Sequence, residues 1–148
     1  MKSFITNSSE ETILLGKRIV EALPSYLHVI LLEGDLSSGK TTLTKGIALG
    51  LGVKSVVNSP TFTILKIYKG IKMLYHLDLY RMDNIGHDFD LEEYIEDPMG
   101  FTVIEWPNQV EALIPKVYVH IKLTYLDLDK RLIEITTSNA LDEWMNTL

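Results

Sequence analysis

The sequence contains no cysteine, few arginines and no apolar run of the roughly 18 residues that a membrane span needs. Without cysteine the chain has no disulfides, no thiolate metal ligands and no cysteine nucleophile. Its net charge is −6 and its only arginines are Arg18, Arg81 and Arg131, so it lacks the basic surface that holds a polyanion unaided. We therefore expect a soluble, cytoplasmic protein that contacts no membrane and does not bind nucleic acid independently.

The length of 148 residues suits one domain. A chain of this size buries roughly 70% of the surface that its unfolded form exposes, which is enough for a core of its own. We predict a single domain over residues 1–148. Within it, residues 83–97 are rich in aspartate and glutamate, and we interpret this segment as a solvated face, with a docking surface for a basic partner as the alternative.

The most specific pattern lies in residues 34–41, Gly-Asp-Leu-Ser-Ser-Gly-Lys-Thr. It fits the phosphate-binding pattern G-x-x-x-x-G-K-[ST] and follows the apolar residues 29–32, where a buried strand is expected to end. Glycines let backbone N–H groups approach phosphate oxygens, and the start of the next helix adds a partial positive charge. A plain Gly/Ser turn would explain the glycines but not the Lys-Thr pair after them.

Two side chains of this P-loop have distinct expected roles. Lys40 is expected to reach the β and γ phosphates of a nucleotide, and the Thr41 hydroxyl is expected to ligate Mg²⁺. The predicted nucleotide-binding residues of the segment are Gly34, Asp35, Leu36, Ser37, Ser38, Gly39, Lys40, Thr41 and Thr42.

Hydrophobic periodicity surrounds the P-loop with helices and hairpins. Ser8 and Glu11 form a capping box for a helix that ends before Pro24, and a second helix follows the P-loop, with Gly52 at its left-handed end. Two further hairpins are expected, one of residues 62–68 and 73–80 and one of residues 117–124 and 132–136, with a strand over 101–105 between them. A helical turn is expected near residues 110–114, and a terminal helix is expected to contain Leu141, Trp144, Met145 and Leu148. The unit around the P-loop is parallel in type whereas hairpins add antiparallel strands, so we predict a P-loop NTPase-like three-layer α/β fold with a mixed central sheet.

Two acidic residues follow apolar runs where strands are expected to end. Asp78 follows residues 75–77 and Glu105 follows residues 101–104. Nucleotide hydrolysis needs carboxylates that hold Mg²⁺ and position water, usually at strand ends beside the P-loop. The candidate catalytic residues are therefore Lys40, Asp78 and Glu105, and the candidate metal ligands are Thr41, Asp78 and Glu105. An acid that only caps a strand is the alternative for either carboxylate.

Two further positions have an open interpretation. His76 lies two residues before Asp78 on the same strand face, where it either orients a carboxylate or water or simply satisfies a neighbour. Residues 59–63, Ser-Pro-Thr-Phe-Thr, follow the P-loop helix, so Thr61 is a candidate switch-like residue that senses the γ-phosphate. A proline turn explains that segment equally well.

The order and spacing of residues 34–42, 59–63, 75–81 and 104–107 strongly resemble the TsaE family over most of the chain. The resemblance implies a small P-loop ATPase that uses ATP and Mg²⁺ and that bacteria need to form N6-threonylcarbamoyladenosine at position 37 of tRNAs reading codons that begin with A. It also implies TsaD and TsaB as partner proteins, with tRNA reached only through the complex.

The resemblance also implies roles for individual residues. By motif position, Lys40 and Thr41 would serve phosphate and Mg²⁺, Asp78 and Glu105 the metal and its waters, and Thr61 the switch-like loop. The family borders its nucleotide near the positions of Ser9 and Lys130, which have no motif of their own here. Trp106 would report nucleotide binding through its fluorescence, although burying a strand end is its simpler role.

The sequence departs from the family in two places. Family P-loops usually read Gly-Ala where this chain has Ser37 and Ser38, which keeps small residues but changes the stiffness of the loop. Residues 82–100 match the family poorly, so we assign no partner contact to that segment.

Other functions share a P-loop and are weighed beside the ATPase. A small-molecule kinase needs additional arginines in a lid to hold two phosphorylated substrates, and this chain has only three. A GTPase is disfavoured because no Asn-Lys-x-Asp motif occurs. A nucleotide-sensing scaffold with little catalysis is the remaining alternative. Any hydrolysis by the chain alone is expected to be slow, because no arginine is clearly placed to stabilise the transition state.

Overall fold

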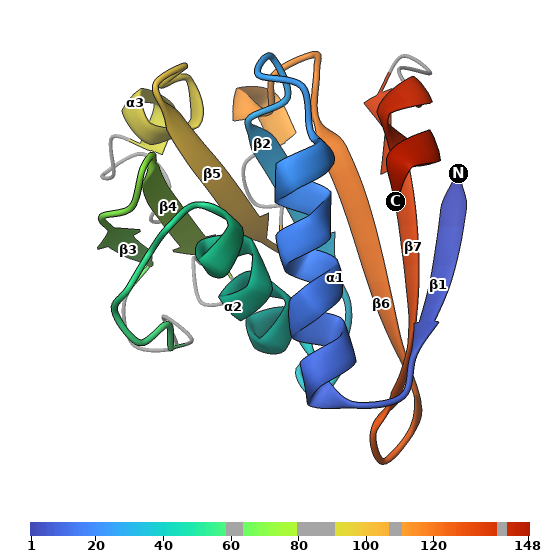
Figure 1. Ribbon diagram of the computed structural model, residues 1–148. Helices are drawn as coiled ribbons and strands as arrows, with labels where there is room; N and C mark the ends of the chain where they lie inside the picture. The colour runs from blue at the N-terminus through green and yellow to red at the C-terminus, as the bar shows by residue number, and fades with distance from the viewer. Residues whose placement is uncertain (59–63, 80–90, 107–110, 139–141) are drawn as a thin grey trace.

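The computed structural model describes residues 1–58, 64–79, 91–106, 111–138 and 142–148 (Figure 1). Thr61 and residues 80–90, which include the first part of the predicted acidic face, lie outside this part of the chain. Within the described residues, no helix is both long and apolar enough to cross a membrane.

One seven-stranded sheet runs through the molecule in the order β1-β7-β6-β2-β5-β4-β3. Its four central strands, β4, β5, β2 and β6, are parallel, and antiparallel strands flank them on both sides. The strands are β1 (Lys2–Thr6), β2 (Val29–Glu33), β3 (Leu65–Tyr68), β4 (Met73–Asp78), β5 (Gly100–Glu105), β6 (Val119–Asp127) and β7 (Lys130–Thr137). The mixed sheet matches the expectation from the sequence, and all six residues of β5 are buried, as a central parallel strand requires.

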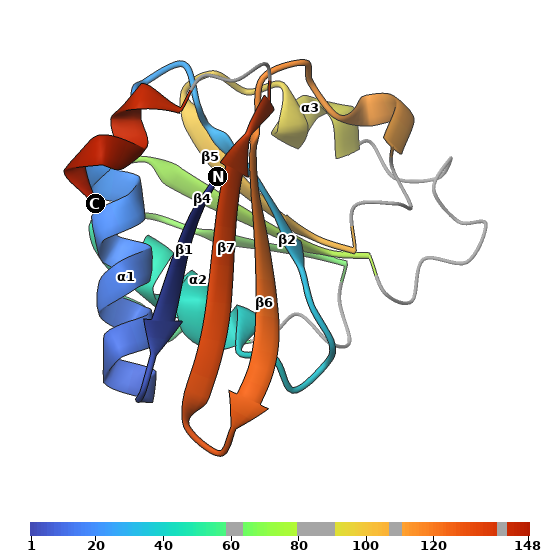
Figure 2. The ribbon, with the colours of Figure 1, turned by 90° about the vertical axis from the view of Figure 1, so that its right-hand side faces the viewer.

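Helices cover the two faces of the sheet unequally (Figure 2). On one face, α1 (Ser9–Ala22) and α2 (Lys40–Gly50) pack over a large core that includes Ile19, Leu43 and Val103. On the other face, the short α3 (Leu91–Ile95) covers a smaller apolar cluster with Leu31, Leu77 and Ile104. The three predicted layers are therefore present.

The ends of α1 and α2 follow the sequence signals. The Ser8 side chain accepts a hydrogen bond from the Glu11 amide at 3.1 Å, while the Glu11 carboxylate accepts one from the Asn7 amide. Helix α2 ends before Gly52, whose φ of 77° is left-handed as predicted. The amide of Val53 then returns to the Ala48 carbonyl at 3.0 Å and closes the last turn.

Two parts of the fold differ from the prediction. β1 was not predicted; it pairs with β7 at the sheet edge, and its half-exposed pattern is too short for a clear periodicity. The expected terminal helix is a 3-10 helix, Glu143–Thr147, with Trp144 and Met145 buried against α1 and the sheet. Leu141 lies outside the described residues.

Contact between α1 and α2 depends on glycines. A Cβ atom at Gly46 would lie 2.0 Å from the Ile13 carbonyl oxygen, and one at Gly16 would lie 2.5 Å from the Leu43 carbonyl oxygen. Backbone atoms of one helix therefore occupy the space of a side chain on the other. This close approach holds the start of α2, and with it the P-loop, against the rest of the core.

We expect Gly46→Ala to lower the free energy of unfolding by about 1–3 kcal/mol, the usual cost of overpacking, although alanine favours a helix more than glycine does. Urea denaturation followed by circular dichroism measures the change. Lys45→Ala, at an exposed position of the same helix, is the control and should leave the midpoint nearly unchanged. If the Gly46→Ala protein is as stable as the wild type, the two helices can move apart to accommodate the methyl group without a loss of stability.

Candidate functional site

The P-loop connects the end of β2 to the first turn of α2. Asp35, Leu36 and Ser37 are exposed in the turn, and Ser38 is buried beneath it. Gly39 has a left-handed φ of 100°, a conformation that a side chain would strain. A Cβ at Gly34 would meet the Ser38 hydroxyl at 2.5 Å and the Leu123 carbonyl at 2.7 Å, so the loop also needs glycine there for close packing.

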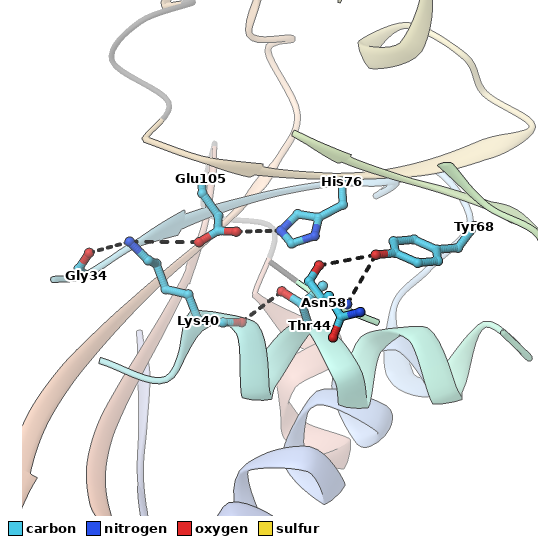
Figure 3. Close-up of polar contacts among 7 residues, drawn as sticks. All are labelled: Gly34, Lys40, Thr44, Asn58, Tyr68, His76 and Glu105. Atoms are coloured by element: carbon cyan, nitrogen blue, oxygen red, sulfur yellow. Dashed lines mark hydrogen bonds and ion pairs between the residues drawn. The ribbon is translucent and has the colours of Figure 1, made fainter. Parts of the chain in front are cut away.

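Lys40 is the central cation of the site (Figure 3). Its side chain is buried, and its Nζ donates to the Gly34 carbonyl at 2.6 Å and lies 3.9 Å from the Glu105 Oε1. Burial lowers the pKa of Lys40, while the negative charges of Glu105, Asp78 and Asp35 act in the opposite direction. The buried ammonium at the start of α2 is thus held by the Gly34 carbonyl and the Glu105 carboxylate.

Glu105 ends β5 and is buried with two partners. Its Oε1 faces Lys40, and its Oε2 lies 2.5 Å from the Nε2 of His76, which is completely buried on β4 (Figure 3). Because β4 and β5 are parallel, Asp78 is the direct Cα partner of Glu105 in the sheet register. The structure therefore brings together Lys40, Asp78 and Glu105, the three residues predicted from separate segments of the sequence.

Trp106 follows Glu105 with a backbone conformation that is unusual for a residue other than glycine. Its φ is 60°, in the left-handed region, which costs free energy and occurs preferentially at functional sites. The Lys40 Nζ lies 4.1 Å from the centre of the Trp106 ring, within the range of a cation–π contact. Trp106 thus touches the P-loop lysine in addition to packing at the strand end.

A small cleft lies beside the P-loop, between α1 and the turn that joins β6 to β7. It is lined by Ser8, Ser9, Thr12, Gly39, Thr42, Leu128, Asp129 and Arg131. Ser9, predicted only from the resemblance, therefore lies close to the P-loop. Lys130, predicted in the same way, is exposed at the start of β7 between two of the lining residues.

Arg131 is a site residue that sequence reasoning missed. Its Nε donates to the Ser38 carbonyl at 3.0 Å, and its Nη1 donates to the carbonyls of Asp127 and Lys130 at 2.8 and 3.0 Å. The guanidinium also lies 4.7 Å from the centre of the Tyr125 ring. Arg131 thereby ties the β6–β7 turn to the P-loop across 93 residues of sequence, and no local motif signals such a contact.

Comparison with known proteins identifies the family of the chain. The sequence model of the family described as "Threonylcarbamoyl adenosine biosynthesis protein TsaE" matches residues 6–133. The chain belongs to the TsaE family. It is 42% identical over 132 residues to the tRNA threonylcarbamoyladenosine biosynthesis protein TsaE of Bacillus subtilis, covering 88% of this chain and 82% of that protein. The TsaE protein of a Nostoc species is 40% identical over 145 residues, covering 95% of this chain and 88% of that protein.

The fold of this TsaE family member is also similar to a solved structure. The crystal structure of Bacillus subtilis YdiB superposes with a TM-score of 0.77 and 33% sequence identity, covering 99% of this chain and 90% of that one. The predicted fold class, a P-loop NTPase-like α/β fold with a mixed sheet, is confirmed, as is the predicted family.

Proposed function

We propose that the protein is a Mg²⁺-dependent ATPase that acts with TsaD and TsaB in forming N6-threonylcarbamoyladenosine at position 37 of tRNAs reading codons that begin with A. The observation that carries the ATPase proposal is the position of Lys40, on a P-loop between β2 and α2 and 3.9 Å from the strand-end carboxylate of Glu105. The names of the similar proteins support the pathway.

The residues of the site support a division of roles. Backbone amides at the start of α2 and the Lys40 ammonium would hold the phosphates of ATP, because both concentrate positive charge at one point. The cleft lined by Ser9, Thr42 and Arg131 would receive the remainder of the nucleotide. Glu105 and Asp78, side by side at two strand ends, would orient the water that attacks the γ-phosphate.

The donor set fits a magnesium ion that phosphates help to bind. Among the described residues, no cluster of three or more His, Cys, Asp or Glu side chains is arranged to hold a metal alone. Mg²⁺ is usually bound by one or two carboxylates together with phosphate oxygens and waters, which matches the Thr41 hydroxyl, Asp78 and Glu105. When bound, the ion would neutralise charge on the phosphates during hydrolysis.

The positions of the described arginines favour an enzyme whose active site is completed by its partner proteins. Arg18 is exposed on α1, and Arg131 is already engaged with the P-loop backbone. Arg81 lies outside the described residues. With a net charge of −6, the protein would meet tRNA only through TsaD and TsaB, in the cytoplasm, and its ATP turnover would reset the assembly rather than supply chemistry to the base.

Replacement of the native TsaE gene in bacterial cells by this chain tests the proposal. We expect normal N6-threonylcarbamoyladenosine in digested tRNA, measured by mass spectrometry, and loss of the modification with Lys40→Ala at equal protein level. Normal modification with Lys40→Ala would contradict the proposal. A pull-down from the same cells should recover TsaD and TsaB, whereas their absence, together with phosphorylation of a metabolite, would favour a kinase.

Arg131→Ala should weaken MgATP binding about fivefold, corresponding to the roughly 1 kcal/mol net value of a typical hydrogen bond. The variant removes the bond to the Ser38 carbonyl, which leaves the P-loop less ordered before ATP binds. Ordering the loop during binding then costs free energy and lowers the affinity. Calorimetric titration measures the change. Arg18→Ala removes the same group from an exposed position and should bind like the wild type. If the two variants bind MgATP equally well, Arg131 does not stabilise the P-loop for nucleotide binding.

A further inference from the structure

We propose that His76 is a positioning residue that holds one oxygen of Glu105 and so directs the other oxygen toward Lys40 and the phosphate site. This inference rests on the proposed ATPase function and adds a residue to it. His76 would touch neither nucleotide nor metal, and would act only through the orientation of Glu105.

The sheet register places His76 diagonally across from Glu105 rather than directly opposite it. In the sheet register, His76 pairs with Val103 and Asp78 pairs with Glu105. His76 therefore lies two residues before the level of Glu105 along the parallel strands, and the two side chains meet diagonally across β4 and β5. With Oε2 at 2.5 Å from the imidazole Nε2, only Oε1 is directed toward Lys40 (Figure 3).

A polar ring at this depth requires an explanation. His76 is completely buried, as are Leu74, two residues earlier on the same face of β4, and the next residue, Leu77. An imidazole in such a place costs free energy unless it is hydrogen-bonded, and a leucine would suit the apolar core better. The bond to Glu105 satisfies the Nε2 of the ring and gives the carboxylate a second partner beside Lys40.

The direction of that hydrogen bond follows from the partners. A carboxylate only accepts, so the Nε2 of His76 donates. Among the described residues, the Nδ1 of His76 is buried and has no hydrogen-bond partner, so the bond to Glu105 is the polar contact that the ring makes there. The geometry therefore gives His76 an Nε2–H group aimed at Glu105.

A second histidine–glutamate pair offers a matched comparison. His120 Nε2 lies 2.9 Å from Glu33 Oε2, on neighbouring strands of the same sheet. That pair is solvent-exposed, with side-chain exposures of 32% and 54%, against 0% and 4% for His76 and Glu105. Loss of the His120 ring should therefore leave the site unchanged.

The test uses His76→Leu, which removes the donor, His76→Gln, which restores an N–H donor, and His120→Leu as the control. ATP hydrolysis is measured in the presence of TsaD and TsaB across a Mg²⁺ titration, and ATP binding is measured by calorimetry with and without Mg²⁺. Partners that orient a metal-binding carboxylate typically contribute 10- to 100-fold to metal affinity or activity. For His76→Leu we expect kcat to fall by about that factor, and the Mg²⁺ concentration at half-maximal rate to rise about tenfold.

Binding of ATP without Mg²⁺ should stay within about threefold of the wild type, because Lys40 and the P-loop are intact. His76→Gln should recover most of the rate and of the Mg²⁺ response. A merely structural histidine would change the folded fraction but not the Mg²⁺ response of the folded protein. An unchanged Mg²⁺ response and kcat in His76→Leu, with an active wild type, would overturn the inference and leave the proposed function standing. An inactive wild type would instead contradict the proposed function.

A measurement on the wild-type protein without nucleotide covers the case in which His76→Leu does not fold. Nitrogen-15 NMR of the imidazole should show that the Nε2 of His76 carries a proton. An Nε2 without a proton would overturn the inference, because it could not donate to Glu105.

Discussion

Lys40→Ala should weaken MgATP binding by about 10- to 100-fold, corresponding to roughly 1.5–3 kcal/mol for hydrogen bonds that involve a charged group. The expectation follows from the surroundings of Lys40, which is buried between the Gly34 carbonyl, Glu105 and the Trp106 ring. No other described lysine is placed in that way, so no neighbour should substitute for it. Calorimetry with ATP and Mg²⁺ measures the affinity, and Trp106 fluorescence offers a second signal.

The control for this change is Lys45→Ala, one turn further along α2. Lys45 is exposed, so its removal changes the net charge by the same amount without touching the site. The two variants separate a specific contact from a general change in electrostatic attraction. If both bind MgATP as well as the wild type, the P-loop lysine has no role in nucleotide binding.

Glu105→Gln should lower the rate of ATP hydrolysis by about 100-fold or more while ATP affinity changes by less than about fivefold. Glutamine keeps the size of the side chain but removes the charge that would hold Mg²⁺ and orient water. Glu105 also counteracts the effect of burial on the pKa of Lys40, so the substitution should lower that pKa further. Single-turnover measurements separate the chemical step from this effect on binding.

Glu33→Gln is the matched control, because Glu33 also accepts from a histidine at a strand end but is exposed. It should hydrolyse ATP like the wild type. In cells, Glu105→Gln should abolish the tRNA modification although ATP is still bound. Normal modification with Glu105→Gln would contradict a need for hydrolysis and would favour the nucleotide-sensing scaffold.

The fold could be predicted wherever local chemistry determines the element. Ser8 and Glu11 cap α1 as their spacing indicates, and the apolar run before Gly34 forms the central strand β2. β1 was missed because a five-residue edge strand with one buried residue has little pattern to detect. The tail was predicted as a helix from the spacing of its apolar residues, but five residues form only a 3-10 helix here.

The chemistry of the site could be predicted, but its contacts could not. Lys40 and Glu105 were identified from their own motifs, whereas the distance between them depends on how β2 and β5 pair in the sheet. The bond between His76 and Glu105 depends in the same way on the register of β4 and β5. Arg131 illustrates the limit, because its role rests on a carbonyl far away in the sequence. The role of Thr61 stays a prediction, since it lies outside the described residues.

Isothermal titration of the folded protein with ATP, in the presence and absence of Mg²⁺, tests the central claim most directly. The account predicts saturable binding of one ATP per chain that strengthens with Mg²⁺ and is weakened by Lys40→Ala. No binding of ATP with Mg²⁺, either by the protein alone or after mixing with TsaD and TsaB, would contradict it.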